Sequence, residues 1–176
     1  MNRILSVVAL ACFVGTVSLS AQMKHVDLKD AKGTSVGMAM ISPAKGGGVS
    51  IDLDVKGLPP GEHALHFHAV PKCEGPDFTS ATGHFNPGGK KHGMENPEGP
   101  HAGDMNNFTV DAKGNAKVTI VNKNVTTGAE PNSMYANGGT ALMIHAAADD
   151  MKTDPSGNAG ARIACGRSEE HTSELQ

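Results

Sequence analysis

Short runs of alternating apolar and polar residues recur along the chain and predict β-strands. In the clearest run, every second residue from Val49 to Val55 is apolar and the residues between them are polar. Such alternation is typical of a half-buried strand. We expect further strands at residues 35–41, 62–70, 108–110, 117–121, 140–146 and 161–164. The turn residues at 111–115 predict a hairpin between the strands on either side of them.

No segment of ten or more residues has the periodicity of an amphipathic helix, and Gly and Pro separate the predicted strands. This pattern predicts an all-β sandwich or barrel. Residues 71–107 and 147–160 are exceptions, because they are rich in turn residues and have almost no apolar run. Long loops inside a compact domain are usually functional or disordered. The histidines in the first of them favour function.

Both ends of the chain differ from the predicted domain. Residues 1–21 resemble a secretory signal: Arg3 precedes an apolar run that is shorter than the roughly 20 residues of a membrane span, and small residues follow it. We therefore expect an exported protein without a membrane span, either periplasmic or secreted. Attachment of a lipid to Cys12, which follows Ala11, is the alternative.

Residues 167–176 are polar and show no strand alternation. Under one choice of codons they spell a common sequencing-library adapter. We therefore expect a native domain over residues 22–166 and a non-native tail after it. Genomic sequence across this junction tests the expectation, and natural codons there would contradict it.

The composition fits a single exported domain. The 176 residues carry a formal net charge of −3 and no basic stripe, so nucleic acid is not expected as a principal partner. Cys73 and Cys165 remain once residues 1–21 are set aside. An even pair in an oxidising compartment predicts a disulfide, with two free buried thiols as the alternative. The bridge would close a loop of roughly 90 residues, which the chain-entropy model stabilises by about 4–5 kcal/mol.

Histidines are the strongest sign of chemistry, because seven of the nine lie between His63 and His145. His66 and His68 are two residues apart on a predicted strand, so both side chains point to one face and can bind one metal ion. His63 falls on the face opposite His68, which favours a hydrogen-bonded structural role. His145 ends the strand at 140–146 and can supply another ligand from across the sheet.

A second set of candidate ligands follows in the long loop, namely His84, His92, His101 and Asp104. Three imidazoles and one carboxylate suit a tetrahedral zinc site, and imidazole also suits copper. Each residue alone has an ordinary explanation; Asp104, for example, could cap a turn. Their accumulation in one loop favours a closed metal site, which would also order the loop.

These motifs, in this order, resemble the copper/zinc superoxide dismutase family and in particular its exported bacterial members. The resemblance covers about residues 24–166. It rests on His66-x-His68, Cys73, Gly83-His84, Lys91-His92-Gly93, His101-x-x-Asp104, Ile144-His145 and residues 157–166. It implies the fold of that family, a Greek-key β-sandwich or flattened barrel of immunoglobulin-like type with two long functional loops. The family is itself a known example of the β-sandwich architecture.

The resemblance also implies the cofactors and the role of each site residue. Copper would be bound by His66, His68, His84 and His145, and zinc by His84, His92, His101 and Asp104. His84 would bridge the two metals and act as a proton donor. Asp149 would link one copper histidine to one zinc histidine, Arg162 would attract the anionic substrate, and Cys73 and Cys165 would form the disulfide.

The implied activity is dismutation of superoxide to O₂ and H₂O₂ by a redox-cycling copper beside a structural zinc. The alternative is a non-catalytic copper- and zinc-binding module on the same fold. Zinc-dependent hydrolysis is disfavoured, because four protein ligands leave no open position for water. The patterns favour neither a monomer nor a homodimer.

Overall fold

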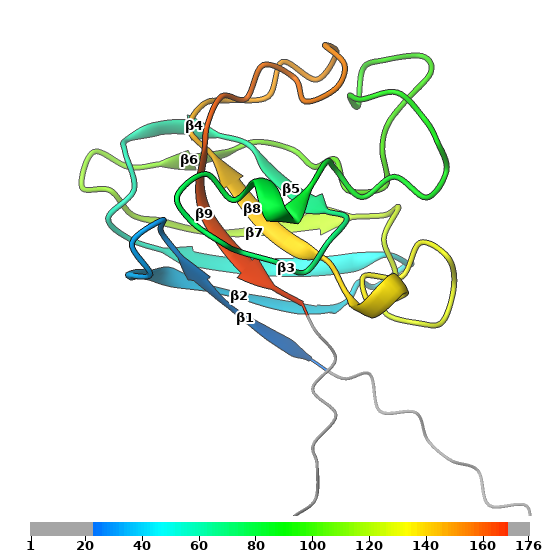
Figure 1. Ribbon diagram of the computed structural model, residues 1–176, viewed down its shortest axis with the longest axis horizontal. Coiled ribbons are helices and arrows are strands. Elements are labelled where there is room, and N and C mark those ends of the chain that lie inside the picture. The colour runs from blue at the N-terminus through cyan, green and yellow to red at the C-terminus, as the bar shows by residue number, and fades with distance from the viewer. Residues whose placement is uncertain (1–22, 169–176) are drawn as a thin grey trace, which may run out of the picture.

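The computed structural model describes residues 23–168, so the predicted secretory signal and most of the polar C-terminal segment lie outside the described residues. The described chain is built from strands and two short 3₁₀ helices (Figure 1). In chain order these are β1 (Lys24–Lys29), β2 (Ser35–Pro43), β3 (Val49–Val55), β4 (Gly61–His63), β5 (Leu65–His68), η1 (Thr79–Ala81), β6 (Phe108–Val110), β7 (Ala116–Asn122), η2 (Ala136–Gly138), β8 (Ala141–His145) and β9 (Arg162–Arg167).

Seven of these strands form one curled antiparallel sheet in the order β5-β8-β9-β1-β2-β3-β7, and β4 pairs with β6 in a second sheet (Figure 1). The curl encloses a large apolar core. In β3, Val49, Ile51, Leu53 and Val55 are all buried in it, as their alternation predicted. The expected all-β architecture is confirmed.

Strand β1 was not among the predicted strands. Its only core residues are Val26 and Leu28, both fully buried, and charged residues or His25 surround them. Two apolar positions are too short a pattern to distinguish a strand from a polar loop. The strand is nevertheless central, because it joins β2 to β9 in the large sheet.

The strand predicted at 62–70 is two strands that belong to different sheets. The break is at Ala64, which is fully buried. Its N–H donates to the carbonyl of Ala147, and its carbonyl accepts the N–H of His145, at 2.9 and 3.0 Å. These bonds turn the backbone from β4 into β5 and attach it to the end of β8.

The predicted hairpin between residues 108–110 and 117–121 is wrong. The turn itself forms, since the N–H of Asp111 donates to the carbonyl of Asn115 at 2.8 Å. However, β6 pairs with β4, whereas β7 pairs with β3. The turn therefore carries the chain around a corner from one sheet to the other.

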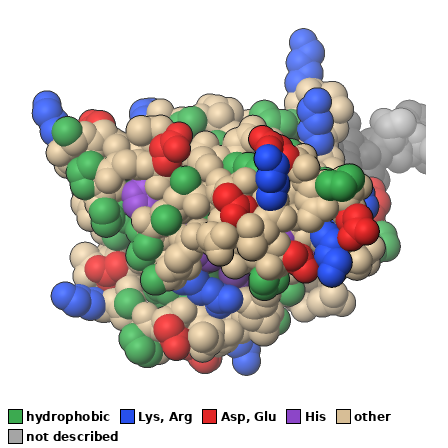
Figure 2. Space-filling model, turned by 90° about the horizontal axis from the view of Figure 1, so that it is seen from above, with side chains coloured by type: hydrophobic (Ala, Val, Ile, Leu, Met, Phe, Trp, Pro, Cys, Tyr) green, Lys and Arg blue, Asp and Glu red, His purple; other side chains and the backbone are tan. Residues whose placement is uncertain are grey.

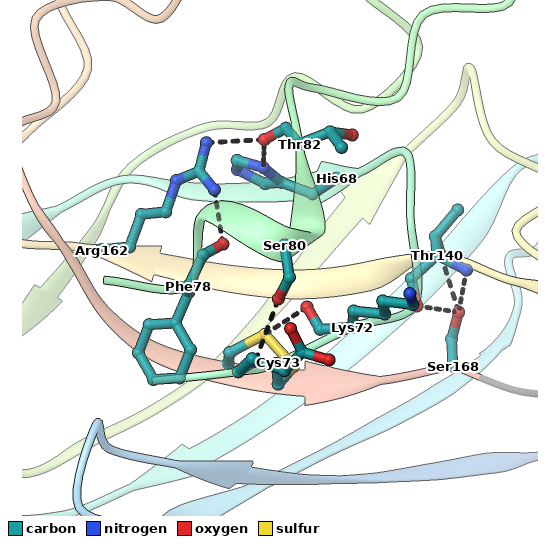
Figure 3. The surroundings of a disulfide bond; sticks show 11 residues. His68, Lys72, Cys73, Phe78, Ser80, Thr82, Thr140, Arg162 and Ser168 are labelled. Atoms are coloured by element: carbon teal, nitrogen blue, oxygen red, sulfur yellow. Dashed lines mark hydrogen bonds between the residues drawn. A yellow bond between two sulfur atoms is a disulfide. The ribbon is translucent and has the colours of Figure 1, made fainter. Parts of the chain in front are cut away.

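The C-terminal boundary expected at Gly166 lies inside β9, which continues to Arg167. Ser168 is fully buried, and its N–H donates to the carbonyl of Thr140 at 2.9 Å. The hydroxyls of Ser168 and Thr140 lie 2.7 Å apart (Figure 3). These two residues thus close the end of the sheet, and the origin of residues 167–176 stays a prediction.

The two long loops expected at 71–107 and 147–160 contain no strand, and only η1 interrupts the first. They follow β5 and β8, which pair antiparallel, so the loops leave the sheet at opposite ends, but they meet where the N–H of Glu95 donates to the carbonyl of Met151 at 3.0 Å. Side chains from these two strands and from the first loop form the candidate site. Within residues 23–168, no helix is both long and apolar enough to cross a membrane.

Candidate metal centre

Three histidines of the site stand on one face of two paired strands. On β5, Leu65 and Phe67 face the core, so His66 and His68 face outward. His66 pairs with Met143 of β8, and His145 lies two residues beyond Met143 on the same face. The alternation of a strand therefore brings all three imidazoles together beneath the loops.

The fourth imidazole comes from the first loop. His84 forms an isolated bridge with His68, which holds the loop against β5 like a short additional strand. The N–H of Phe85 also donates to the carbonyl of Phe67, at 2.7 Å. One ring nitrogen each of His66, His68, His84 and His145 lies within 4.8 Å of all the others.

In each of these four imidazoles, one nitrogen is held by the protein. The partners are Asp149 for His66 Nε2 (2.7 Å), the Thr82 carbonyl for His68 Nδ1 (2.9 Å), Asp104 for His84 Nδ1 (2.9 Å) and the Gly160 carbonyl for His145 Nδ1 (3.3 Å). Such partners fix the orientation of a metal-binding imidazole. The second nitrogen of each ring is left to face the centre of the group.

Two of these inward nitrogens are buried without a hydrogen-bond partner, which favours binding of a metal ion. Among the described residues, the buried side-chain atoms without a hydrogen-bond partner are His66 Nδ1 and His84 Nε2. An unsatisfied buried polar atom costs roughly 1–3 kcal/mol, and an ion that it binds removes that cost. Four imidazole nitrogens suit copper. The residues present fit this metal.

A second group shares His84 and adds His92, His101 and Asp104, all of them buried. The Oδ1 of Asp104 lies 2.9, 3.1 and 3.4 Å from the Nδ1 atoms of His84, His92 and His101. At metal–nitrogen distances of 2.0–2.1 Å, the ligand atoms of a tetrahedral zinc site lie about 3.3–3.4 Å apart. These three distances, and the 3.5 Å between the Nδ1 atoms of His84 and His101, are close to that spacing.

Backbone groups hold Asp104 in this position. The N–H groups of Gly93 and His101 donate to its Oδ2 at 2.9 and 3.0 Å, which leaves Oδ1 to face the histidines. Burial raises the pKa of Asp104, but the hydrogen bonds from His101, His84 and His92 outweigh it and hold the pKa well below its usual range. The carboxylate is therefore charged at neutral pH.

Burial lowers the pKa of histidines in both groups, but hydrogen bonds reverse the effect at His92. Burial lowers the pKa of His145 to about 3 and that of His84 to about 4, and neighbouring histidines reinforce the effect. Burial and His84 also lower the pKa of His68. These three rings are neutral at pH 7, which is the form that binds a metal. His92 differs: burial lowers its pKa, but hydrogen bonds to Asp104 and Asp149 outweigh this and raise it to about 9.

Asp149 connects the two groups. Its Oδ2 accepts the Nε2–H of His66 at 2.7 Å, and its Oδ1 accepts the Nε2–H of His92 at 3.0 Å. The cluster of these three residues is thus a hydrogen-bonded support of both candidate metal groups. Gly157 makes room for it: its φ is +62°, and a Cβ there would collide with Asp149 and His92.

Arg162 begins β9 and lies beside the first group (Figure 3). Its Nη1 and Nη2 donate to the carbonyls of Phe78 and Thr82, both at 2.6 Å. The Thr82 carbonyl also accepts the Nδ1–H of His68, so one carbonyl orients both side chains. A guanidinium has five N–H donors, and donors therefore remain for an anion.

The expected disulfide between Cys73 and Cys165 is formed and joins residues 92 positions apart. It ties the first loop to β9 close to Arg162 (Figure 3). Phe78 and Thr82, whose carbonyls bond Arg162, lie in this tethered loop. The structure thus brings every predicted site residue to this centre. His63 lies behind it, buried, with Nδ1 2.7 Å from the carbonyl of His145 and Nε2 2.8 Å from that of Pro59.

Sequence reasoning missed several supporting residues. Thr82, Phe78 and Gly160 act through their carbonyls, which any residue type carries, so the sequence holds no signal for them. Asn107 donates to the carbonyl of Asp149 and accepts its backbone N–H, both at 2.9 Å, and so joins the two long loops. An asparagine in a turn-rich loop is ordinary, and only the fold reveals this pairing.

Seen from above, only small patches of histidine are visible on the surface of the molecule (Figure 2). The buried ligands, the shared imidazole and the all-β scaffold define a protein with a paired metal centre. The family model for copper/zinc superoxide dismutase (SODC) matches residues 35–167. The chain therefore belongs to the copper/zinc superoxide dismutase family.

Curated and solved relatives agree with this assignment. "Superoxide dismutase [Cu-Zn] 2" of Aquifex aeolicus is 48% identical over 169 residues, which cover 94% of this chain and 98% of the relative. The crystal structure of a SOD-like protein from Bacillus subtilis has a TM-score of 0.80 at 37% identity and covers 84% of this chain and 99% of its own. Cu/Zn superoxide dismutase from Brucella abortus has a TM-score of 0.70 at 30% identity, over 84% of this chain and 100% of its own.

Proposed function

We propose that the protein dismutates superoxide, so that two superoxide anions and two protons give one O₂ and one H₂O₂. His66, His68, His84 and His145 would hold copper, and His84, His92, His101 and Asp104 would hold zinc. The observation that carries this proposal is His84, because its two ring nitrogens serve different groups: Nδ1 faces Asp104, and Nε2 is the buried atom without a hydrogen-bond partner.

Copper, when bound, supplies a centre that accepts and returns one electron, whereas zinc supplies charge without redox chemistry. The protein itself orients the ligands. Asp149 holds His66, the Thr82 carbonyl holds His68 and the Gly160 carbonyl holds His145. His84 Nε2 is the atom at which the chain can hold a proton beside the reacting anion, while Nδ1 stays on the side of Asp104.

Arg162 would bind the anionic substrate. Its charge acts on His68 and His145, since it contributes to lowering the pKa of both, so the guanidinium lies close to the first metal group. A positive group beside a buried site steers anions toward it and raises the association rate, and salt weakens the effect. The presence of this arginine together with four inward imidazoles favours an enzyme over a non-catalytic metal-binding module.

Pulse radiolysis of the copper- and zinc-loaded protein over a range of ionic strengths tests the activity and the role of Arg162. We expect a second-order rate constant that approaches about 10⁹ M⁻¹s⁻¹ and falls as salt is added, as in the known diffusion-limited enzymes of this family. Arg162→Ala should lower the constant by about tenfold and flatten its dependence on salt.

Arg162→Lys is the matched control, because it keeps the charge but cannot bond both carbonyls in the same geometry. It should retain the dependence on salt and lose part of the rate. Full metal content without superoxide decay above background would instead support the non-catalytic module. An unchanged rate and salt dependence in Arg162→Ala would remove the steering role.

Zinc binding to the metal-free protein should release protons because of His92. Its raised pKa, about 9, means that the metal-free ring is protonated at pH 8, with Nδ1–H and Nε2–H facing Asp104 and Asp149. Zinc would take the place of the Nδ1 proton. The apparent affinity should therefore rise by about tenfold per pH unit up to about pH 9 and level off above it.

The raised pKa of His92 also affects the stability of the metal-free protein, which should fall as pH rises. A pKa raised above its unfolded value stabilises the folded state below about pH 6.5, and this contribution is lost as pH rises through about 9.

Calorimetric titration with zinc in buffers of different ionisation enthalpy counts the protons that zinc binding releases. Asp149→Asn is the control, since it weakens the interaction that raises the pKa and should reduce the release. A release that does not change between pH 7.5 and 9.5 would contradict the role of His92.

We also propose that the protein is exported and that residues 1–21 are removed, leaving a mature protein that is periplasmic or secreted. The disulfide supports export, because such bonds persist in oxidising compartments. N-terminal sequencing of the protein recovered from a bacterial host should find a start near Gln22. A chain that still begins at Met1 would contradict the proposal, and a lipid on Cys12 would show the alternative route.

A further inference from the structure

The outer face of the sheet at β1 and β2 carries a further group of side chains whose residue types can bind metals. His25 of β1 lies directly opposite Met40 of β2, and Met38 lies two residues from Met40 on the same face. His25 is exposed, Met40 is partly exposed, and Met38 is 45% exposed. Met23, just before β1, is 61% exposed.

This group is separate from the paired metal centre. The order of the sheet places β9 and β8 between β1 and β5, the strand of His66 and His68. Most of the two long loops lies away from β1 and β2 (Figure 1), and only the start of the first loop, with Cys73, Gly75 and Phe78, lines a hollow together with His25. None of the ligands proposed for copper and zinc comes from β1 or β2.

The spacing allows the side chains to meet. Residues directly opposite in an antiparallel pair have Cβ atoms about 4.5–5.5 Å apart, and diagonal neighbours about 7–8 Å. His25 therefore has Met40 as its direct neighbour and Met38 as its diagonal one. Methionine is unbranched and flexible, so both sulfur atoms can turn toward one ion beside the imidazole.

The surroundings favour a cation. Asp27 and Asp54 flank Met38 on the neighbouring strands, and Asp52 lies opposite Met40. Met38, Met40, Asp52 and Asp54 line a hollow of about 390 Å³ on this face, whereas His25 and Asp27 line a separate hollow of about 470 Å³. Lys117 forms an ion pair with Asp54 at 3.1 Å, and Thr119 donates to Asp52 at 2.6 Å, so Asp27, opposite Met38, is the acid that can favour a bound cation.

We propose that His25, Met38 and Met40 form a binding site for a soft monovalent metal ion, Cu(I), on the outer face of the sheet. Thioether sulfur selects Cu(I) over zinc and other harder divalent ions, and imidazole completes a ligand set that copper accepts. Met23 supplies a further thioether at the edge of the group. The site would hold copper that is additional to the copper of the paired centre. It does not rest on the proposed activity.

Titration of the copper- and zinc-loaded protein with Ag(I), a redox-inert probe for Cu(I), tests the site. We expect one equivalent of Ag(I) to bind in addition to the metals already present, with shifts of the ε-methyl NMR signals of Met38 and Met40. The double variant Met38→Leu/Met40→Leu keeps the apolar volume and should weaken binding by at least about tenfold. His25→Gln should weaken it as well.

Met94→Leu is the matched control, because Met94 is also 45% exposed but lies on the first long loop. It should leave Ag(I) binding unchanged. The proposal is overturned if no additional equivalent binds, if the double variant binds as tightly as the original protein, or if Ag(I) merely displaces the copper already present. Since the readout is binding and not superoxide decay, failure of the dismutase assay would not affect it.

Discussion

His84→Ala should remove both metals and lower the rate of superoxide decay by more than about 100-fold, beyond what loss of a supporting residue usually costs. The residue belongs to both ligand groups, so its loss leaves three ligands in each. It also leaves Asp104 without the Nδ1–H at 2.9 Å and breaks the bridge that holds the loop to His68. Copper and zinc content, measured with the rate on the same sample, check the result.

His92→Ala is the control for this variant. His92 belongs to the zinc group and not to the copper group, so its loss should remove zinc and leave copper in place. The two variants thus separate loss of the bridge from loss of one ligand. If His84→Ala keeps a full equivalent of either metal and a rate within about tenfold of the original, the assignment of the bridge is wrong.

Removal of the disulfide should cost the metal-free protein about 4–5 kcal/mol of unfolding free energy, since the bridge spans 92 positions of sequence. Cys73→Ser/Cys165→Ala is the suitable variant, because Cys165 is buried and a hydroxyl there would have to be satisfied. Urea unfolding of the metal-free protein measures the change. A loss below about 1 kcal/mol would show that the loop is held mainly by other contacts.

The same variant should reduce activity by a separate route. The carbonyls that orient Arg162 belong to Phe78 and Thr82, which lie in the tethered loop. Once the loop is free to move, the guanidinium loses its fixed position beside the metals. We expect a weaker salt dependence of the rate with copper and zinc content unchanged. The original protein treated with a reductant is the control and should behave in the same way.

Much of the fold followed from local pattern, and the predictions failed where that pattern is short or where strand pairing had to be inferred. The alternation in β3 is long enough to identify the strand and its buried face. Strand β1 has only Val26 and Leu28 as a signal, and it was missed. The turn at 111–115 was identified correctly, but no local feature shows that β6 pairs with β4. Pairing partners are decided by the packing of distant segments, which periodicity does not encode.

The sequence by itself determined which side chains are available for metal binding and their spacing along the chain. His66 and His68 had to share a face because a strand alternates, and the loop ligands could be recognised through their resemblance to a family. Only the tertiary structure decided which nitrogen of each ring faces the ligand group, because the fold places Asp149, Thr82 and Gly160 against the other nitrogen. The direction of each ring and its state of protonation depend on neighbours distant in sequence. Those neighbours come together only when the sheet curls and both long loops close over it.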